Sequence, residues 1–304
     1  MAFLLSRVVQ SVVVLWLVGS LTFLALQVVG DPIALLVAED ATVQERQRLR
    51  EAFGLDQPWW VQYWLFIQNA ATGNLGNSFY SARSAFGLLL ERLPATLSLV
   101  VLGLSLGLVF GVPLGVIAAV RVGSSFDRFI QHLSALLIAA PTFWLGMILI
   151  QLFAVEWRIL PSQGSGTLWH LLLPALTLAL SRMGVYIQMV RLQLLEVLGL
   201  DFVRTARAKG LRESVVVYRH ALRNALIPLV TVLGLQVSGL LSGAVVIESL
   251  FAYPGMNRVA LEALNRLDMP VILAFVLLSA FVYSVVHFVV DLMYVALDPR
   301  IVYV

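Results

Sequence analysis

Residues 97–119 read LSLVVLGLSLGLVFGVPLGVIAA, a run without a charged side chain. A helix needs about 20 mainly apolar residues to cross the ~30 Å hydrocarbon core of a bilayer. The whole chain has the same character. Of its 304 residues, 60% are hydrophobic and 12% are charged, whereas soluble domains have roughly 25% charged residues. The sequence therefore excludes a water-soluble globule and predicts an all-α polytopic membrane protein.

Six apolar runs lie between charged flanks, and we predict one transmembrane helix for each. They are residues 9–29, 97–119, 131–154, 168–190, 226–248 and 271–294. The first run is longer than the apolar region of a usual signal peptide, and no A-x-A-like cleavage site follows it before Gly30. We therefore expect residues 1–30 to form the first transmembrane helix and residues 94–304 to form a core of five more.

Basic residues indicate the topology because they concentrate in short cytoplasmic loops. The loops near 121–130 and 191–223 are rich in arginine, whereas the opposite short loops hold only three arginines. Both termini are thus predicted to be cytoplasmic, and residues 31–93 to form an extracytoplasmic insertion. Its aromatic cluster between Trp59 and Trp64 fits an interfacial belt better than the alternative, a ligand site.

The sequence offers few groups for catalysis or redox chemistry. It has no cysteine, which excludes disulfides, thiolate metal sites and redox pairs. Lys209, the only lysine, lacks the preceding glycine of a P-loop, so ATP hydrolysis must belong to another subunit. No serine of the fifth run has the glycine two residues earlier that rhomboid-type proteases show. His132, His170 and His287 have no metal-ligand spacing between them, so we predict neither an enzyme nor a metal site.

Small residues and prolines suggest closely packed, kinked helices. The second run carries glycines at i, i+4 spacing, which share one helix face and let another backbone approach. They are Gly103, Gly107, Gly111 and Gly115. We predict that this face packs against another helix. Pro113, Pro141 and Pro174 fall inside the second, third and fourth runs, where proline permits kinks.

Ionisable residues within apolar runs are costly and are candidates for a translocation pathway. We select Arg182, Glu248 and Asp291. Arg182 lies about eight residues, or roughly 12 Å, inside the predicted end of its run, so we expect it to face a cavity or an acidic partner rather than lipid. Glu248 and Asp291 lie nearer the predicted ends, where a structural role beside interfacial water is the alternative.

The longest predicted cytoplasmic loop contains a helix–glycine–helix pattern. Residues 201–228 read DFVRTARAKGLRESVVVYRHALRNALIP. Residues 202–209 favour a helix, Gly210 is a natural helix end, and residues 213–223 restart a helix before Pro228 opens the fifth run. A loop that only held positive charge inside would not need this pattern, so we predict a docking element.

This loop resembles the EAA loop of permease subunits of bacterial ABC importers, in the variant of the dipeptide, oligopeptide and nickel permease family. Thr205-Ala206-Arg207 stands where the general motif has Glu-Ala-Ala, and Gly210 falls on its glycine. Arg223 stands near the place of the motif's proline, and Asn257 where the family more often has glycine. The resemblance covers nearly the whole chain. It includes Gly30-Asp31-Pro32, residues 73–79, residues 92–97, Pro254-Gly255 and the tail 291–300.

The resemblance implies a type I ABC importer transmembrane domain in the bacterial inner membrane, the first permease of its pair, with six helices and both termini inside. The implied partners are a second homologous permease, two cytoplasmic P-loop ATPases and an extracytoplasmic binding protein. ATP and magnesium would bind the ATPases, and this chain would bind no cofactor. The residues implied to couple to the ATPase are Arg204, Thr205, Ala206, Arg207, Lys209, Gly210, Leu211 and His220. For the arginines, attraction to anionic lipid is the alternative.

The cargo that the resemblance implies is a di- or oligopeptide. Nickel or other metal chelates, glutathione and opines are alternatives within the same importer class. An ion-coupled secondary transporter that uses Arg182, Glu248 and Asp291 is the alternative from another class. Such a carrier has no need of the helix–glycine–helix loop, which favours the importer.

Overall fold

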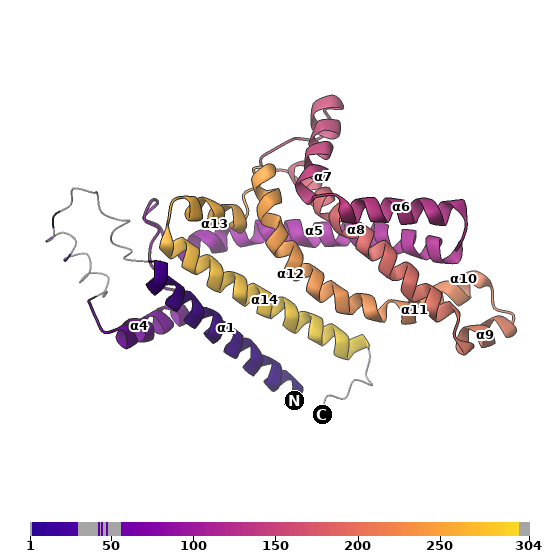
Figure 1. The fold of residues 1–304 in the computed structure, drawn as a ribbon, viewed down its shortest axis with the longest axis horizontal. Coiled ribbons are helices and arrows are strands. Elements are labelled where there is room, and N and C mark those ends of the chain that lie inside the picture. Colours follow the sequence, from indigo (N-terminus) through magenta and orange to yellow (C-terminus); the bar gives the residue numbers. More distant parts are fainter. Residues whose placement is uncertain (1, 30–41, 43, 45–46, 48–55, 298–304) are drawn as a thin grey trace. The chain divides into compact units, whose positions relative to one another are not determined.

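The computed structural model describes residues 2–29, 42, 44, 47 and 56–297 (Figure 1). Within these residues the regular secondary structure is helical, and one isolated bridge pairs Asn77 with Ser84. The chain divides into two compact units. The first consists of residues 1–94 and 255–288, and the second of residues 95–254 with the end of the chain.

The described residues of the first unit form four helices and the start of a fifth. They are α1 (Ala2–Val29), α4 (Trp59–Thr72), the first turns of α5 (Ala85–Val120), α13 (Met256–Asn265) and most of α14 (Met269–Leu297). Aromatic contacts hold α1 to α4, where the rings of Phe23 and Tyr63 meet edge to face at 5.4 Å. The buried carboxylate of Asp268, just before α14, accepts a hydrogen bond of 2.6 Å from the Ser78 hydroxyl. This bond ties the segment before α5 to the start of α14.

The second unit contains the rest of α5 and the helices that follow it. They are α6 (Ser125–Ala139), α7 (Thr142–Leu149), η1 (Ile150–Glu156), α8 (Leu168–Leu198), α9 (Asp201–Ala208), α10 (Glu213–Val215), η2 (Val216–Ala221), α11 (Leu222–Ala225) and α12 (Ile227–Leu250). The segments η1 and η2 are π-helices. Figure 1 shows α9 and α10 beyond the end of α8, at the same end of this unit as the turn between α5 and α6.

Glycines bring three helices of the second unit into close contact. The four glycines of α5 that the sequence groups on one face all meet α8, because a Cβ at any of them would lie 2.8–3.0 Å from atoms of that helix. The tightest is Gly115, at 2.8 Å from the carbonyl oxygen of Ile187. Sequence reasoning missed Gly184 of α8, where a Cβ would lie 2.5 Å from the carbonyl oxygen of Ser134 in α6. Helix α8 therefore packs tightly against both α5 and α6.

Among the described residues, four helical stretches are long and apolar enough to cross a membrane, or five if one bent pair of helices counts as a span. The four are Ser6–Ala25, Ala85–Val120, Leu168–Leu198 and Met269–Leu292. They fall on the first, second, fourth and sixth predicted runs, and α12 falls on the fifth. The prediction of an all-helical, multi-pass chain is therefore confirmed.

The third run, predicted as a single span over 131–154, is instead two helices. α6 ends at Ala139, α7 begins at Thr142, and the two stretches meet at 107°. Proline lacks an amide N–H and disfavours helical backbone at the preceding residue. Ala140 before Pro141 accordingly has extended backbone, with ψ of 128°. The predicted run is therefore broken into two helices, and the break lies at the proline expected to permit a kink.

Candidate functional site

The loop after α8 has the helix–glycine–helix form predicted for it. Helix α9 ends at Ala208, and α10 begins at Glu213. Gly210 has φ of +73°, a left-handed conformation that is costly for any residue with a Cβ. Its amide N–H donates to the carbonyl oxygen of Arg207 at 2.9 Å, which closes the end of α9. The predicted pattern is confirmed.

An ion pair bridges this turn. Arg207 donates from Nη2 to Oε1 of Glu213 at 2.7 Å and from Nε to Oε2 at 3.1 Å. The hydrogen bond from Arg207 lowers the pKa of Glu213, and the bond to Glu213 raises the pKa of Arg207. Both side chains are about half exposed. The pair helps to fix the angle between α9 and α10.

Helix α9 has one buried face and one exposed face. Val203 and Ala206 are buried in a cluster with apolar side chains of α5, α8, η2 and α11. Packing inside the chain therefore accounts for the small side chain of Ala206. His220 is half-buried in η2. The other predicted coupling residues are exposed: Arg204, Thr205, Arg207, Lys209, Gly210 and Leu211.

A groove of about 440 Å³ opens beside α10. Its walls come from the end of α5, from the start of α6 and from the segment α10–η2. The lining residues are Val116, Ile117, Val120, Arg121, Phe126, Glu213, Ser214, Val217 and Tyr218. The exposed surface of the loop thus continues into a mainly apolar groove.

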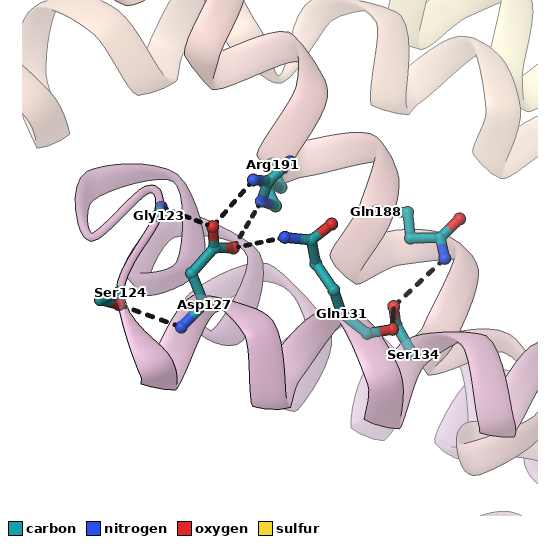
Figure 2. A network of polar contacts seen from close by, with 7 residues as sticks. All are labelled: Gly123, Ser124, Asp127, Gln131, Ser134, Gln188 and Arg191. Atoms are coloured by element: carbon teal, nitrogen blue, oxygen red, sulfur yellow. Dashed lines mark hydrogen bonds and ion pairs between the residues drawn. The ribbon is translucent and has the colours of Figure 1, made fainter.

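A buried ion pair fastens α6 to α8 close to this loop (Figure 2). Arg191 donates from Nε and Nη2 to the two carboxylate oxygens of Asp127, at 2.7 and 2.9 Å. Asp127 is 1% exposed and also accepts from the amide of Gly123 and the side chain of Gln131. Its own amide donates to Ser124, which caps α6. Sequence reasoning missed this pair, although Asp127 is the only acid in its loop.

Arg182 lies in the middle of α8 and contacts α12. Its Nη1 donates to Oε1 of Gln236 at 3.0 Å. Its Nε is buried and has no hydrogen-bond partner among the described residues. A Cβ at Gly239 would lie 3.2 Å from its Nη2. The acidic partner considered for Arg182 is therefore not found in the part of the chain that the structure describes.

Glu248 does not join Arg182 in one site. Glu248 is fully buried and accepts a hydrogen bond of 2.6 Å from the Thr96 hydroxyl. It stands twelve positions beyond Gln236 on α12, a rise of about 18 Å along the helix. Asp291 is half-buried on α14. The contact with Thr96 supports a structural role for Glu248.

Comparison with known proteins identifies the family of this chain. Residues 111–303 match the family described as "Binding-protein-dependent transport system inner membrane component", and residues 1–100 match its N-terminal counterpart. The chain belongs to this family. It is 38% identical to the "Glutathione transport system permease protein GsiC" of Escherichia coli over 302 residues, which are 99% of each chain. It is 37% identical, with the same coverage, to the protein of that name from Shigella dysenteriae.

The fold of the binding-protein-dependent permeases is also seen in a solved structure. A chain of the inward-facing MetNI methionine ABC transporter matches with a TM-score of 0.59 and 20% identity, over 69% of this chain and 96% of that chain. Family and relatives together make this protein a permease subunit of an ABC importer, in the bacterial inner membrane. ATPase subunits and a binding protein are partners of this class in general. The resemblance found in the sequence is confirmed, and the ion-coupled secondary transporter is set aside.

Proposed function

We propose that this permease pairs with a second homologous permease and forms half of a pathway for small peptides. Relatives 37–38% identical over nearly their full length are named as glutathione permeases, and glutathione is a tripeptide. That likeness favours a peptide cargo, glutathione included, over nickel chelates or opines. ATP and magnesium bind the ATPase partners in this proposal, and this chain binds no cofactor.

The proposed topology has six transmembrane helices with both termini in the cytoplasm. Six crossings come from three sources in this proposal: the four apolar stretches, helix α12, and the bent pair formed by α6 with α7–η1. The loop between α8 and α12 must face the cytoplasm to reach an ATPase. Since that loop follows the fourth crossing, the N-terminus then lies on the same side, in agreement with the basic loops.

The coupling site in this proposal is the exposed face of α9 and the turn after it. The observation that carries it is the two-sided character of α9, which has a buried face anchored in the core and an exposed face with Arg204; the exposed Leu211 lies in the turn that follows. An anchored element that presents basic and apolar groups suits docking into a groove of a partner, where acids meet arginines and apolar surfaces pack.

Co-purification of the ATPase subunits with the tagged permease in mild detergent tests this site. Leu211→Glu and Arg204→Glu alter exposed side chains, so they should leave the fold intact. We expect each to reduce the ATPase recovered about tenfold or more, the effect of losing roughly 1.4 kcal/mol at an interface. Arg128→Glu is the matched control, an exposed arginine of α6 outside the loop. Full retention of the ATPases by both loop variants contradicts the proposed coupling site.

A further inference from the structure

Arg182 occupies a position where a charge is costly. It stands fourteen residues after the start of α8 and sixteen before its end, in a stretch apolar enough to cross a membrane. Arginine at such a depth is rare and generally pairs with an acid or faces a polar path. Here its one hydrogen bond within the described residues goes to the neutral side chain of Gln236. The positive charge is therefore not neutralised by the described part of the chain.

One edge of this guanidinium has no hydrogen-bond partner among the described residues. A guanidinium has five N–H donors, and its Nε and Nη2 together match the two oxygens of a carboxylate. Arg191 on the same helix uses that edge to bind Asp127. In Arg182 the bond to Gln236 uses Nη1, whereas Nε has no partner among the described residues. The edge of the guanidinium that binds a carboxylate in Arg191 therefore binds no carboxylate in Arg182 within the described residues.

Helix α12 contacts the guanidinium through Gln236 and Gly239. Gln236 and Gly239 are three positions apart on α12, so both face the same neighbour. A side chain at position 239 would crowd Nη2, which lies 3.2 Å from the place of its Cβ. Arg182, Gln236 and Gly239 are all partly exposed. The Arg182 side chain as a whole is therefore partly exposed, whereas its Nε atom is buried in this structure.

The hydroxyl of Tyr186 adds a second polar group on the same helix. Tyr186 is one turn beyond Arg182, and its ring is fully buried against α5. Its hydroxyl has no hydrogen-bond partner among the described residues. Buried polar groups are generally hydrogen-bonded, so an unpaired donor in this region is unusual.

We propose that Arg182 binds a carboxylate of the substrate during translocation, through its Nε and Nη2. The inference rests on the proposed peptide pathway and narrows the cargo to peptides with a free carboxylate. Gln236 positions the guanidinium, and Gly239, which has no side chain, leaves Nη2 uncrowded. A substrate carboxylate neutralises the charge of Arg182 only while the substrate is bound. Such temporary pairing suits a site that must also release the substrate.

Uptake by the complete importer in proteoliposomes tests the proposal, with the ATPases and the binding protein present. The probe is a tripeptide mixture in which each member is supplied as the free acid and as the C-terminal amide. Imported peptides are identified by mass spectrometry, and acid and amide affinities of the binding protein are measured separately. Arg182→Gln should lower the acid-to-amide uptake ratio about tenfold or more, as expected for the loss of a charge-assisted hydrogen bond. Arg182→Lys keeps the positive charge but lacks the paired Nε and Nη2 donors. Its acid-to-amide uptake ratio should therefore lie between the ratios of the wild type and of Arg182→Gln.

Ser181→Ala is the matched control, since the one hydrogen bond of the Ser181 hydroxyl within the described part of the chain goes to its own helix, at the carbonyl of Leu178. It should leave the ratio unchanged. Gly239→Val should lower the ratio without removing the charge, and it keeps the test valid if Arg182→Gln fails to fold. An equal loss of acid and amide uptake in Arg182→Gln means that Arg182 is structural or pairs with the partner permease, and overturns the proposal. An unchanged ratio overturns it as well.

Recovery of the ATPases with the wild-type complex distinguishes a failure of the carboxylate site from a failure of the proposed importer function on which it rests. If the wild-type complex lacks them, the proposed coupling site fails first. If the complex assembles and hydrolyses ATP but imports no peptide of either kind, the peptide pathway and the carboxylate site are both refuted.

Discussion

Arg191 and Arg182 lie nine residues apart on α8, and their surroundings differ in one respect. Arg191 binds the buried carboxylate of Asp127 with Nε and Nη2, and three further hydrogen bonds join Asp127 to Gly123, Ser124 and Gln131. Arg182 has a neutral amide on Nη1 and no carboxylate within the described residues. A permanently paired arginine holds two helices together, whereas an arginine left open can exchange its partner. The same side chain on one helix thus serves structure in one place and suits binding in another.

The largest expected effect is the loss of the Asp127 carboxylate. Asp127→Ala leaves Arg191, whose side chain is 14% exposed, charged and without its partner. Removing one member of a buried pair costs about 3–5 kcal/mol in the free energy of unfolding. Denaturant unfolding in detergent measures this loss. The double variant Asp127→Leu with Arg191→Leu removes both charges and should recover most of it. A single variant as stable as the wild type would show that the pair does not hold α6 to α8.

Gly184→Ala should have the next largest effect. Gly184 lies between the two arginines, and a Cβ there would collide with the Ser134 carbonyl of α6 at 2.5 Å. Overpacking of this kind costs about 1–3 kcal/mol and moves α6 away from α8, which also loosens the Asp127 pair. Thermal unfolding measures it. Gly199→Ala is the control, because its Cβ would meet only the carbonyl of Glu196, at 3.4 Å. Equal stability of the two variants contradicts the tight contact.

The exposed ion pair of Arg207 and Glu213 should contribute much less to the free energy of unfolding than the buried pair of Asp127 and Arg191. Surface ion pairs contribute about 0.2–1 kcal/mol, so Glu213→Gln should cost no more than that. The pKa of Glu213 is lowered in the folded protein by the bond from Arg207. Its stabilising effect is therefore present above the ordinary pKa of 4.5 and is lost as the pH falls below it. Unfolding of wild type and Glu213→Gln at pH 7 and pH 3 checks this, and a difference that grows on acidification has the wrong sign.

The smallest change in stability is expected for Arg182→Gln. No described carboxylate loses its partner, and only the hydrogen bond to the neutral Gln236 is removed, so the free energy of unfolding should change little. The same denaturant assay as for Asp127→Ala makes the contrast direct. A loss as large as that of Asp127→Ala means that Arg182 has a fixed acidic partner, and the contrast between the two arginines disappears.

Local signals in the sequence predicted the loop after α8 and most of the helices. Gly210 and the residues on either side determine a helix end and a restart, and apolar runs determine where long helices lie. Long-range pairs could not be predicted in this way. Asp127 and Arg191 are 64 positions apart, and nothing local to either residue indicates that a bidentate pair forms. Pro141 indicated that a kink was possible, but a bend of 107° depends on tertiary packing.

The buried face of α9 has a mechanical consequence. Val203 and Ala206 belong to the same packed cluster as Tyr186, which lies one turn from Arg182. Protein interiors are as dense as organic crystals and have low compressibility. The cluster therefore joins α9 rigidly to the part of α8 that lies one turn from Arg182. When α9 is displaced, the part of α8 that carries Arg182 should move with it, because the packed cluster between them deforms little.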